Sequence, residues 1–219
     1  MFSSIKALFI IVALVTAPAL YGQYSESDWK DRDQWMNPEQ IFKMANIEQG
    51  DDIADVGCHQ GYMSFHLARY VGENGKVFSV DVRQDRLNSL NEIALERGIK
   101  NIQTILGDYD DPKLPENSLD VVLIIDTYHE MKDYREILQH AKKALKPNGR
   151  ILILEKLKSE MIGKSRQEQT KAHTLSPGYV ENELKEVGFK VTRIEKDLGN
   201  WERNSQKRIW VMVGILPES

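Results

Sequence analysis

The sequence predicts an α/β fold in which a doubly wound, largely parallel sheet carries helices on both faces. The first observation behind this prediction is the stretch from Asp52 to Val82, which reads as strand, glycine-bearing turn, helix and strand. The second is that short apolar runs and amphipathic runs continue to follow one another along the rest of the 219-residue chain. Ligands of such sheets bind beyond the carboxyl ends of the strands, so the site residues are expected there.

The first unit of the sheet has a clear local pattern. An apolar run at 53–56 ends in a turn from Gly57 to Gly61. The segment after the turn places apolar residues at four-residue spacing, as on one face of a helix: Met63, Leu67 and Val71. A second apolar run at 77–80 then ends on Asp81. This pattern predicts a nucleotide-binding unit with its ligand over the glycine turn.

The glycine spacing argues against a dinucleotide such as NAD. A dinucleotide fingerprint that starts at Gly57 needs glycine at the positions of His59 and Tyr62. The third of those glycines lets the helix close on the strand while its N-terminus faces a pyrophosphate. What remains is an acid-x-Gly-x-x-x-Gly motif, formed by Asp55, Gly57 and Gly61.

This motif resembles motif I of the class I S-adenosylmethionine-dependent methyltransferases of the small-molecule type. Asp81 lies 20 residues after Gly61, where that family places the carboxylate that accepts hydrogen bonds from both ribose hydroxyls. The resemblance implies a Rossmann-like doubly wound sheet of seven strands, mostly parallel with an antiparallel last strand. It also implies S-adenosylmethionine as the cofactor. The turn LKPNG at 145–149 resembles the turn that usually leads into the family's fifth strand.

The resemblance assigns the cofactor to the glycine turn and its neighbours. The amides of the turn are expected to hold the methionine carboxylate, and Gly57 allows close approach of the backbone. His59 stands where the family usually has a glycine, so it either fills a permissive turn position or adds a titratable group over the cofactor. Residues beside these positions are also expected at the cofactor: Cys58, Val82 and Asp126.

The composition is that of a globular protein, with 41% hydrophobic and 28% charged residues. We expect one methyltransferase domain over residues 38–219. The formal net charge of −4 argues against a nucleic-acid partner. The sequence does not predict an oligomeric state.

The N-terminus resembles a secretory signal peptide over residues 1–22. Lys6 precedes an apolar run from Ala7 to Ala17, and small residues follow at the expected cleavage positions, after Ala19 or Gly22. We expect an exported protein with no stable membrane span after cleavage, and an uncleaved membrane anchor is the alternative. Export conflicts with the supply of S-adenosylmethionine, which is made in the cytoplasm.

A polar segment at 23–37 precedes the domain, and Asn37 with Pro38 predicts a short helix over Pro38 to Ala45. In the family such a segment lies across the cofactor and acceptor sites. Trp35 and Met36 are therefore expected in a lid, unless the tryptophans simply cover the edge of the sheet.

The remaining elements follow in order along the chain. Amphipathic runs predict helices at 83–97, 134–145 and 179–187. Apolar runs predict strands at 102–106, 119–125, 150–154, 189–194 and 208–213. The run at 119–125, LDVVLII, is typical of a central strand buried on both faces. The polar stretch at 156–171 is interpreted as a helical or mobile insert over the mouth of the site.

Acidic residues follow the third predicted strand. In the family an acid at this place accepts a hydrogen bond from the adenine amino group, so the resemblance assigns that role to Asp108, with Tyr109 packing nearby. Alternatively, Asp108, Asp110 and Asp111 form a turn before Pro112. Turn chemistry explains these acids more simply than a metal does, and no metal site is predicted.

The stretch from Asp126 to Glu130 follows the fourth predicted strand, where the family's fold faces the transferring methyl group. His129 matches a histidine that many small-molecule methyltransferases carry here, and Tyr128 is expected to orient the acceptor. His129 is the candidate general base for an acceptor that must lose a proton. Alternatively, His129 and Glu130 cap the next helix.

Two functions are therefore predicted. The first is transfer of a methyl group from S-adenosylmethionine to a small-molecule acceptor, in which the protein aligns the reactants and excludes water. The second is an exported, non-catalytic protein of the same fold that binds a nucleoside-like ligand. The intact series of acids and glycines favours the first function, while export and His59 favour the second. The sequence does not identify the acceptor.

Overall fold

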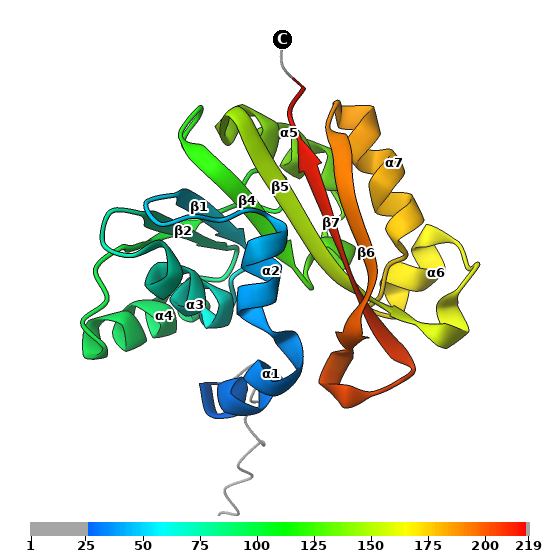
Figure 1. Cartoon of the computed structure of the whole chain (residues 1–219), viewed down its shortest axis with the longest axis horizontal. Helices are drawn as coiled ribbons and strands as arrows, with labels where there is room; N and C mark the ends of the chain where they lie inside the picture. The colour runs from blue at the N-terminus through cyan, green and yellow to red at the C-terminus, as the bar shows by residue number, and fades with distance from the viewer. Residues whose placement is uncertain (1–25, 218–219) are drawn as a thin grey trace, which may run out of the picture.

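The strands of the sheet run in the order β3-β2-β1-β4-β5-β7-β6, in a computed structural model that describes residues 26–217. Strands β1 to β5 pair in parallel, whereas β7 is antiparallel to both of its neighbours, β5 and β6. Figure 1 shows the sheet with α3 and α4 near β1 and β2, and with α6 and α7 near β6 and β7. The predicted seven-stranded, mostly parallel sheet is confirmed.

The bounds of the elements agree with most of the predicted ones. The strands are β1 Asp52–Val56, β2 Lys76–Asp81, β3 Ile102–Leu106, β4 Leu119–Ile125, β5 Leu145–Lys158, β6 Lys190–Asn200 and β7 Lys207–Ile215. The α-helices are α1 Trp29–Met36, α2 Pro38–Met44, α3 Tyr62–Val71, α4 Gln84–Glu96, α5 Tyr134–Ala144, α6 Arg166–Lys171 and α7 Pro177–Val187. Strands β3 and β4 have the predicted limits.

Two hydrophobic clusters hold the layers together, one on each face of the sheet. On one face, the cluster packs the four helices from α1 through α4 against the sheet. On the other face, the cluster packs α5 and α7 against the sheet. Successive residues of β4 alternate between them, with Val121 and Leu123 on the first face and Val122 and Ile124 on the second. All four are fully buried, as predicted for a central strand.

Helix α1 corrects the prediction that residues 23–37 form only a polar segment. It contains only three apolar residues, so its periodicity is weak in the sequence. Trp29 and Met36 are nevertheless buried, with exposed fractions of 8% and 0%, because they pack into the cluster on the first face. Tertiary packing, not intrinsic propensity, stabilises such a short helix.

Strand β5 is longer than predicted at both ends. Leu145 pairs with Leu119 of β4, so the strand begins at the first residue of LKPNG rather than after it. At the other end Lys158 still pairs with Lys207 of β7, so the expected insert at 156–171 begins as strand. The rest of that stretch includes α6, which begins with a capping box formed by Ser165 and Glu168.

The predicted signal peptide at 1–22 lies outside the described residues. Within residues 26–217, none of the helices combines the length and the apolar character that crossing a membrane requires.

Candidate functional site

A cavity of about 540 Å³ lies at the carboxyl ends of β1, β2 and β4. Helix α1 contributes Arg32 to its wall, and the other lining residues follow the ends of the strands. They include most of the residues predicted for the cofactor: Asp55, Gly57, Cys58, His59, Asp81, Val82, Asp108, Tyr109 and Asp126. Strand order reverses between β1 and β4, and ligands of open α/β sheets bind at such a reversal.

The glycines of the turn are required by packing within the protein. Gly57 has a φ of +82°, and a Cβ atom built on it would lie 2.4 Å from Cγ2 of Thr127. Gly61 has a φ of +92°, and its Cβ would lie 2.8 Å from the side chain of Leu90. The prediction gave close approach of a cofactor as the reason for Gly57. The structure adds another reason, since the turn presses against the loop after β4.

Asp81 holds the turn to the end of β2. Its buried carboxylate accepts hydrogen bonds from the backbone N–H of His59 at 3.0 Å and of Arg83 at 2.9 Å. The guanidinium of Arg86 lies 3.3 Å from the same carboxylate. A carboxylate can accept about four hydrogen bonds, so Asp81 retains capacity for a ligand hydroxyl.

His59 adopts a left-handed backbone conformation with a φ of 54° and lines the cavity. Burial and the nearby positive charge of Arg86 lower the pKa of its imidazole to about 4. The ring is therefore neutral near pH 7. Both sequence interpretations of His59 have support, because its backbone fits the turn and its side chain adds a neutral imidazole to the wall.

Asp55 lies below the turn rather than at its mouth. Its carboxylate is 2% exposed and accepts a hydrogen bond of 2.6 Å from Ser64 Oγ, which in turn accepts one of 2.8 Å from Ser79 Oγ. Burial raises the pKa of the Asp55 carboxyl to about 6. The acid of the motif therefore joins the end of β1 to α3 through Ser64.

The predicted adenine end of the site is more open. The carboxylate of Asp108 forms an ion pair of 2.9 Å with Lys113, and Tyr109 is 76% exposed. The backbone N–H of Asp108 also donates to the carbonyl of Asp111, and Asp111 Oδ1 accepts from the backbone N–H of Lys113. The acids therefore form a turn, as one interpretation expected, and that turn carries Asp108 and Tyr109 to the cavity.

A buried ion pair lies where β4 and β5 end. Lys156 Nζ contacts the carboxylate of Asp126, and the side chains are only 7% and 5% exposed. Burial raises the pKa of the Asp126 carboxyl in spite of this positive charge. Lys156 also lies 4.6 Å from the ring centre of Trp201. The sequence interpretation placed Lys156 in a surface insert and missed this pair.

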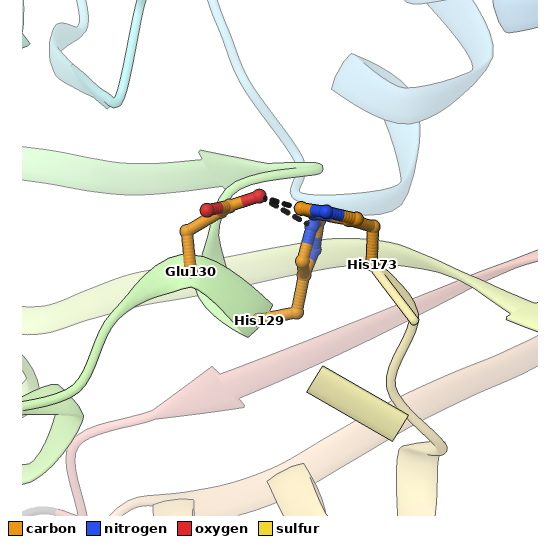
Figure 2. Close-up of side chains that lie close together, drawn as sticks. All are labelled: His129, Glu130 and His173. Carbon is orange, nitrogen blue, oxygen red and sulfur yellow. Dashed lines mark hydrogen bonds and ion pairs between the residues drawn. The ribbon is translucent and has the colours of Figure 1, made fainter. Parts of the chain in front are cut away.

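His129 is held by Glu155 of β5. Its Nδ1 lies 2.9 Å from both carboxylate oxygens of Glu155, and its backbone N–H donates to the same carboxylate at 3.0 Å. Burial alone would lower the pKa of the imidazole, but the charge and hydrogen bond of Glu155 outweigh burial and raise it. His129 Nε2 lies 3.2 Å from Glu130, which lines the cavity (Figure 2). These contacts do not fit a helix-capping role, since α5 begins after Asp133.

Tyr128 lies on the other side of this loop, away from the cavity. Its ring is fully buried in the cluster on the second face of the sheet, and its hydroxyl donates to Glu183 of α7 at 2.8 Å. Arg166 binds the same carboxylate group. The expectation that Tyr128 orients the acceptor is therefore corrected: its hydroxyl joins the loop after β4 to α7.

Of the N-terminal segment expected to form a lid, Arg32 lines the cavity, whereas Trp35 and Met36 are not among the lining residues. Met36 is fully buried, and Trp35 packs against Trp201 with ring centres 4.7 Å apart. The guanidinium of Arg32 lies 4.2 Å from the ring centre of Tyr62. Arg32, Trp35 and Met36 share one helical face by their spacing, which is the only sequence signal for Arg32.

The fold and the cavity define a protein of the doubly wound α/β class, with a site beyond the carboxyl ends of its strands. A family model described as "Methyltransferase domain" matches residues 47–207, and the chain belongs to this family. The predicted family membership is therefore confirmed.

Relatives and solved structures agree with this assignment. The chain is 28% identical over 125 residues to a demethylmenaquinone methyltransferase from Geobacillus sp.. The matched residues cover 57% of this chain and 53% of the relative. The chain is also 31% identical over 111 residues to a nocamycin O-methyltransferase from Saccharothrix syringae, covering 51% of this chain and 40% of the relative. The chain thus spans about half the length of these curated relatives.

Two solved structures share the fold. One is an S-adenosylmethionine-dependent methyltransferase from Aquifex aeolicus, with a TM-score of 0.72 and 23% identity over 89% of this chain and all of that one. The other is the [4+2]-cyclase SpnF, with a TM-score of 0.70 and 16% identity over 84% of this chain and 81% of that one. Because one of these neighbours is named for a different reaction, the fold alone does not define the activity.

Proposed function

We propose that the protein transfers a methyl group from S-adenosylmethionine to a small-molecule acceptor. The observation that carries this proposal is the buried Asp81 carboxylate, fixed by the amide of His59 beside the Gly57–Gly61 turn. It has the position and the remaining hydrogen-bonding capacity that binding of ribose hydroxyls requires. Membership of the methyltransferase domain family supports the same chemistry.

The cavity fits the cofactor in size and in chemistry. Its volume of about 540 Å³ is within the usual range for small-molecule sites. Asp81 would hold the ribose, and Asp108 with Tyr109 the adenine. The expectation that the turn amides hold the methionine carboxylate is corrected, because most of them already donate within the protein: Gly57 and Cys58 to the carbonyl of Val80, His59 to Asp81, and Gly61 to the carbonyl of Cys58. When bound, S-adenosylmethionine supplies an electrophilic methyl group on a sulfonium. Asp55 and Asp126 supply negative charge around this cation when they are ionised.

The acceptor belongs at the end of the cavity formed by the loop after β4. Glu130 and Met131 line that end, and Arg32 from α1 also lines the cavity. Alignment of the acceptor and exclusion of water account for most of the work in such a displacement. For an acceptor that must lose a proton, Glu155 holds His129 Nδ1, so that Nε2 is the atom available to take it.

The names of the relatives indicate a broad class of acceptor but not a particular compound. A demethylmenaquinone methyltransferase, a ubiquinone/menaquinone C-methyltransferase and a nocamycin O-methyltransferase are all similar to this chain. These names support a small organic acceptor methylated at carbon or oxygen. Phenols, quinols and enols are therefore the first acceptors to test.

Binding and turnover test the proposal in two stages. Calorimetry should detect S-adenosylmethionine and S-adenosylhomocysteine binding to the wild type. Release of S-adenosylhomocysteine with an acceptor panel should then identify turnover. Failure to bind either nucleoside would contradict the proposal. Binding without turnover on any acceptor would favour the second candidate, a non-catalytic protein that binds a nucleoside-like ligand.

We also propose that the protein is exported. Export would favour the second candidate, because S-adenosylmethionine is made in the cytoplasm. Lys6, the apolar run at 7–17 and the small residues near Ala19 and Gly22 support a signal peptide over residues 1–22. Mass spectrometry of the protein from its native host should find a mature N-terminus after Ala19 or Gly22. An intact N-terminus in the membrane fraction would instead support the uncleaved anchor.

A further inference from the structure

Three potential metal ligands converge beside the cavity (Figure 2). His129 and Glu130 lie in the short 3₁₀ turn after β4, and His173 lies in the turn after α6. His129 Nε2 is 3.2 Å and His173 Nδ1 is 2.7 Å from Glu130 Oε1, and the three ligand atoms all lie within 4.8 Å of one another. Figure 2 shows both imidazole rings turned toward the carboxylate of Glu130. Thus two imidazole nitrogens and one carboxylate oxygen can face a single point.

The separations are close to those around a bound transition metal. Ligand atoms about 2.0–2.2 Å from an ion are about 2.8–3.6 Å apart at angles of about 90–109°. The His129–Glu130 separation of 3.2 Å lies within this range, and the His173–Glu130 separation of 2.7 Å is just below it. An ion therefore requires a shift of His173 by only a few tenths of an ångström. His173 is 67% exposed, so its side chain has room to make that shift.

Glu155 orients one of the ligands. Because its buried carboxylate binds His129 Nδ1, Nε2 is the ring nitrogen that faces Glu130 and is left to bind an ion. A carboxylate on the far nitrogen is the usual support for a metal-bound histidine, since it fixes both tautomer and ring orientation. Glu155 is fully buried, so this support is rigid.

The backbone that carries His173 is also fixed, although the side chain is exposed. His173 has a φ of 52°. The next residue, Thr174, is fully buried and its hydroxyl donates to the carbonyl of Lys156 at 2.6 Å. Before it, the carbonyl of Ala172 accepts a hydrogen bond of 2.6 Å from Lys158 Nζ. Strand β5 therefore holds the turn on both sides of His173.

A second group of possible ligands nearby is already engaged. Asp126, His129 and Glu155 also lie within 4.8 Å of one another. However, Lys156 contacts Asp126, and Glu155 binds the Nδ1 atom of His129. Around both groups, the three acidic side chains Asp126, Glu130 and Glu155 outnumber the one lysine, Lys156. Their net negative charge favours a cation at the first group, formed by His129, Glu130 and His173.

We propose that His129, Glu130 and His173 bind one divalent transition-metal ion of the zinc type. Three protein ligands leave coordination positions open, which is the pattern of reactive rather than structural sites. Since Glu130 also lines the cavity, an open position can take an oxygen atom of the acceptor. This last step rests on the proposed methyl transfer, whereas the binding of the ion does not. His129 Nε2 cannot bind the ion and take a proton at once, so the metal site replaces the general-base role of His129 in the loaded protein.

Titration of the untagged protein with Co²⁺ and Zn²⁺ tests the site. We expect one equivalent of Co²⁺ to bind with visible d–d absorption bands, and Zn²⁺ to displace it. His173→Ala and Glu130→Gln should each weaken Zn²⁺ binding at least tenfold, as loss of a ligand does. His140→Ala is the matched control, because His140 also pairs with an exposed acid, Asp111, at 3.4 Å. It should bind Zn²⁺ like the wild type.

The outcomes separate this proposal from the proposed function. Circular dichroism should find both ligand variants folded, and calorimetry should give His173→Ala, whose side chain is not among the lining residues of the cavity, wild-type affinity for S-adenosylmethionine. If the wild type binds S-adenosylmethionine but no metal, or if His173→Ala and Glu130→Gln bind Zn²⁺ as well as His140→Ala does, the metal site is wrong. If the wild type binds Zn²⁺ through these residues but does not bind S-adenosylmethionine, the metal site stands and the methyltransferase proposal fails.

Discussion

The two ends of the cavity are built in different ways. At the end nearest β1 and β2, most of the lining residues come from one stretch, 55–86, and backbone hydrogen bonds to Asp81 hold its turn. Asp108 and Tyr109, from the loop after β3, also line the cavity. At the end nearest β4 and β5, side chains from distant parts of the chain meet in ion pairs: Asp126 with Lys156, His129 with Glu155, and Glu130 with His173. The local motif tolerates few changes because Gly57 and Gly61 adopt positive φ values that other residues adopt only with strain. The assembled end depends instead on pairs of side chains, several of them buried.

The largest expected effect is on turnover and belongs to the assembled end. His129→Gln keeps a polar side chain but removes the imidazole that Glu155 orients. For the metal-free protein we expect an unchanged affinity for S-adenosylmethionine and a rate about 10²–10⁴ times lower, the usual size of a general acid–base contribution. Calorimetry and steady-state kinetics on one preparation measure both quantities. A variant with lower melting temperature but full turnover would remove His129 from the chemistry.

The second prediction tests whether the glycine turn is fixed by contact as well as by backbone strain. Gly57→Ala places a Cβ against Thr127 at a positive φ, and strain with overpacking should lower the free energy of unfolding by about 2–5 kcal/mol. Gly50→Ala is the matched control, since Gly50 has a φ of +90° and nothing within 4 Å of the added Cβ. It should lose only the strain part, about 1–2 kcal/mol. Equal losses in urea unfolding would exclude the contact with Thr127.

The third prediction concerns the cost of the buried acid beneath the turn. The pKa of Asp55 is about 6 in the folded protein, above its ordinary value of 3.8, because of burial. The folded state therefore holds this proton more tightly than the unfolded state does. The contribution of the group to stability is complete below about pH 4 and is lost as pH rises through about 6.

Asp55→Asn removes this titration and can still accept the hydrogen bond from Ser64. Its stability relative to the wild type should increase by up to about 3 kcal/mol between pH 4 and pH 7, from roughly 1.4 kcal/mol per pKa unit. Unfolding free energies measured across this range test the effect, with Asp85→Asn, an exposed acid, as the control. A difference between Asp55→Asn and the wild type that does not change with pH would show that Asp55 is not the group responsible.

The smallest effect is expected on cofactor binding at Asp81. Asp81→Ala should weaken S-adenosylmethionine binding by about 1–3 kcal/mol, because the ribose hydroxyls lose a charged acceptor. Asp85→Ala alters an acid four residues further along the chain and should leave the affinity unchanged. Calorimetry that gives the same affinity for Asp81→Ala and the wild type would remove Asp81 from the site.

The sequence by itself determined the elements whose signal is local. Strands 102–106 and 119–125 have the predicted limits because continuous apolar runs bounded by polar turns define buried strands. The unit from Asp52 to Val82 was predictable because a strand, a turn at positive φ and an amphipathic helix each leave a short-range pattern. The same motif located Asp55, Gly57 and Asp81 at one cavity.

Only the tertiary structure decided which side chains meet at the end of the cavity nearest β4 and β5. The loop after β4 turns Tyr128 toward Glu183, 55 residues away, and His129 toward Glu155, 26 residues away. Glu130 meets His173, which lies 43 residues further along the chain. Sequence periodicity indicates which residues share a face of one element. The partners across elements depend on strand order and register, and here the placement of β5 beside β4 brings Glu155 to His129.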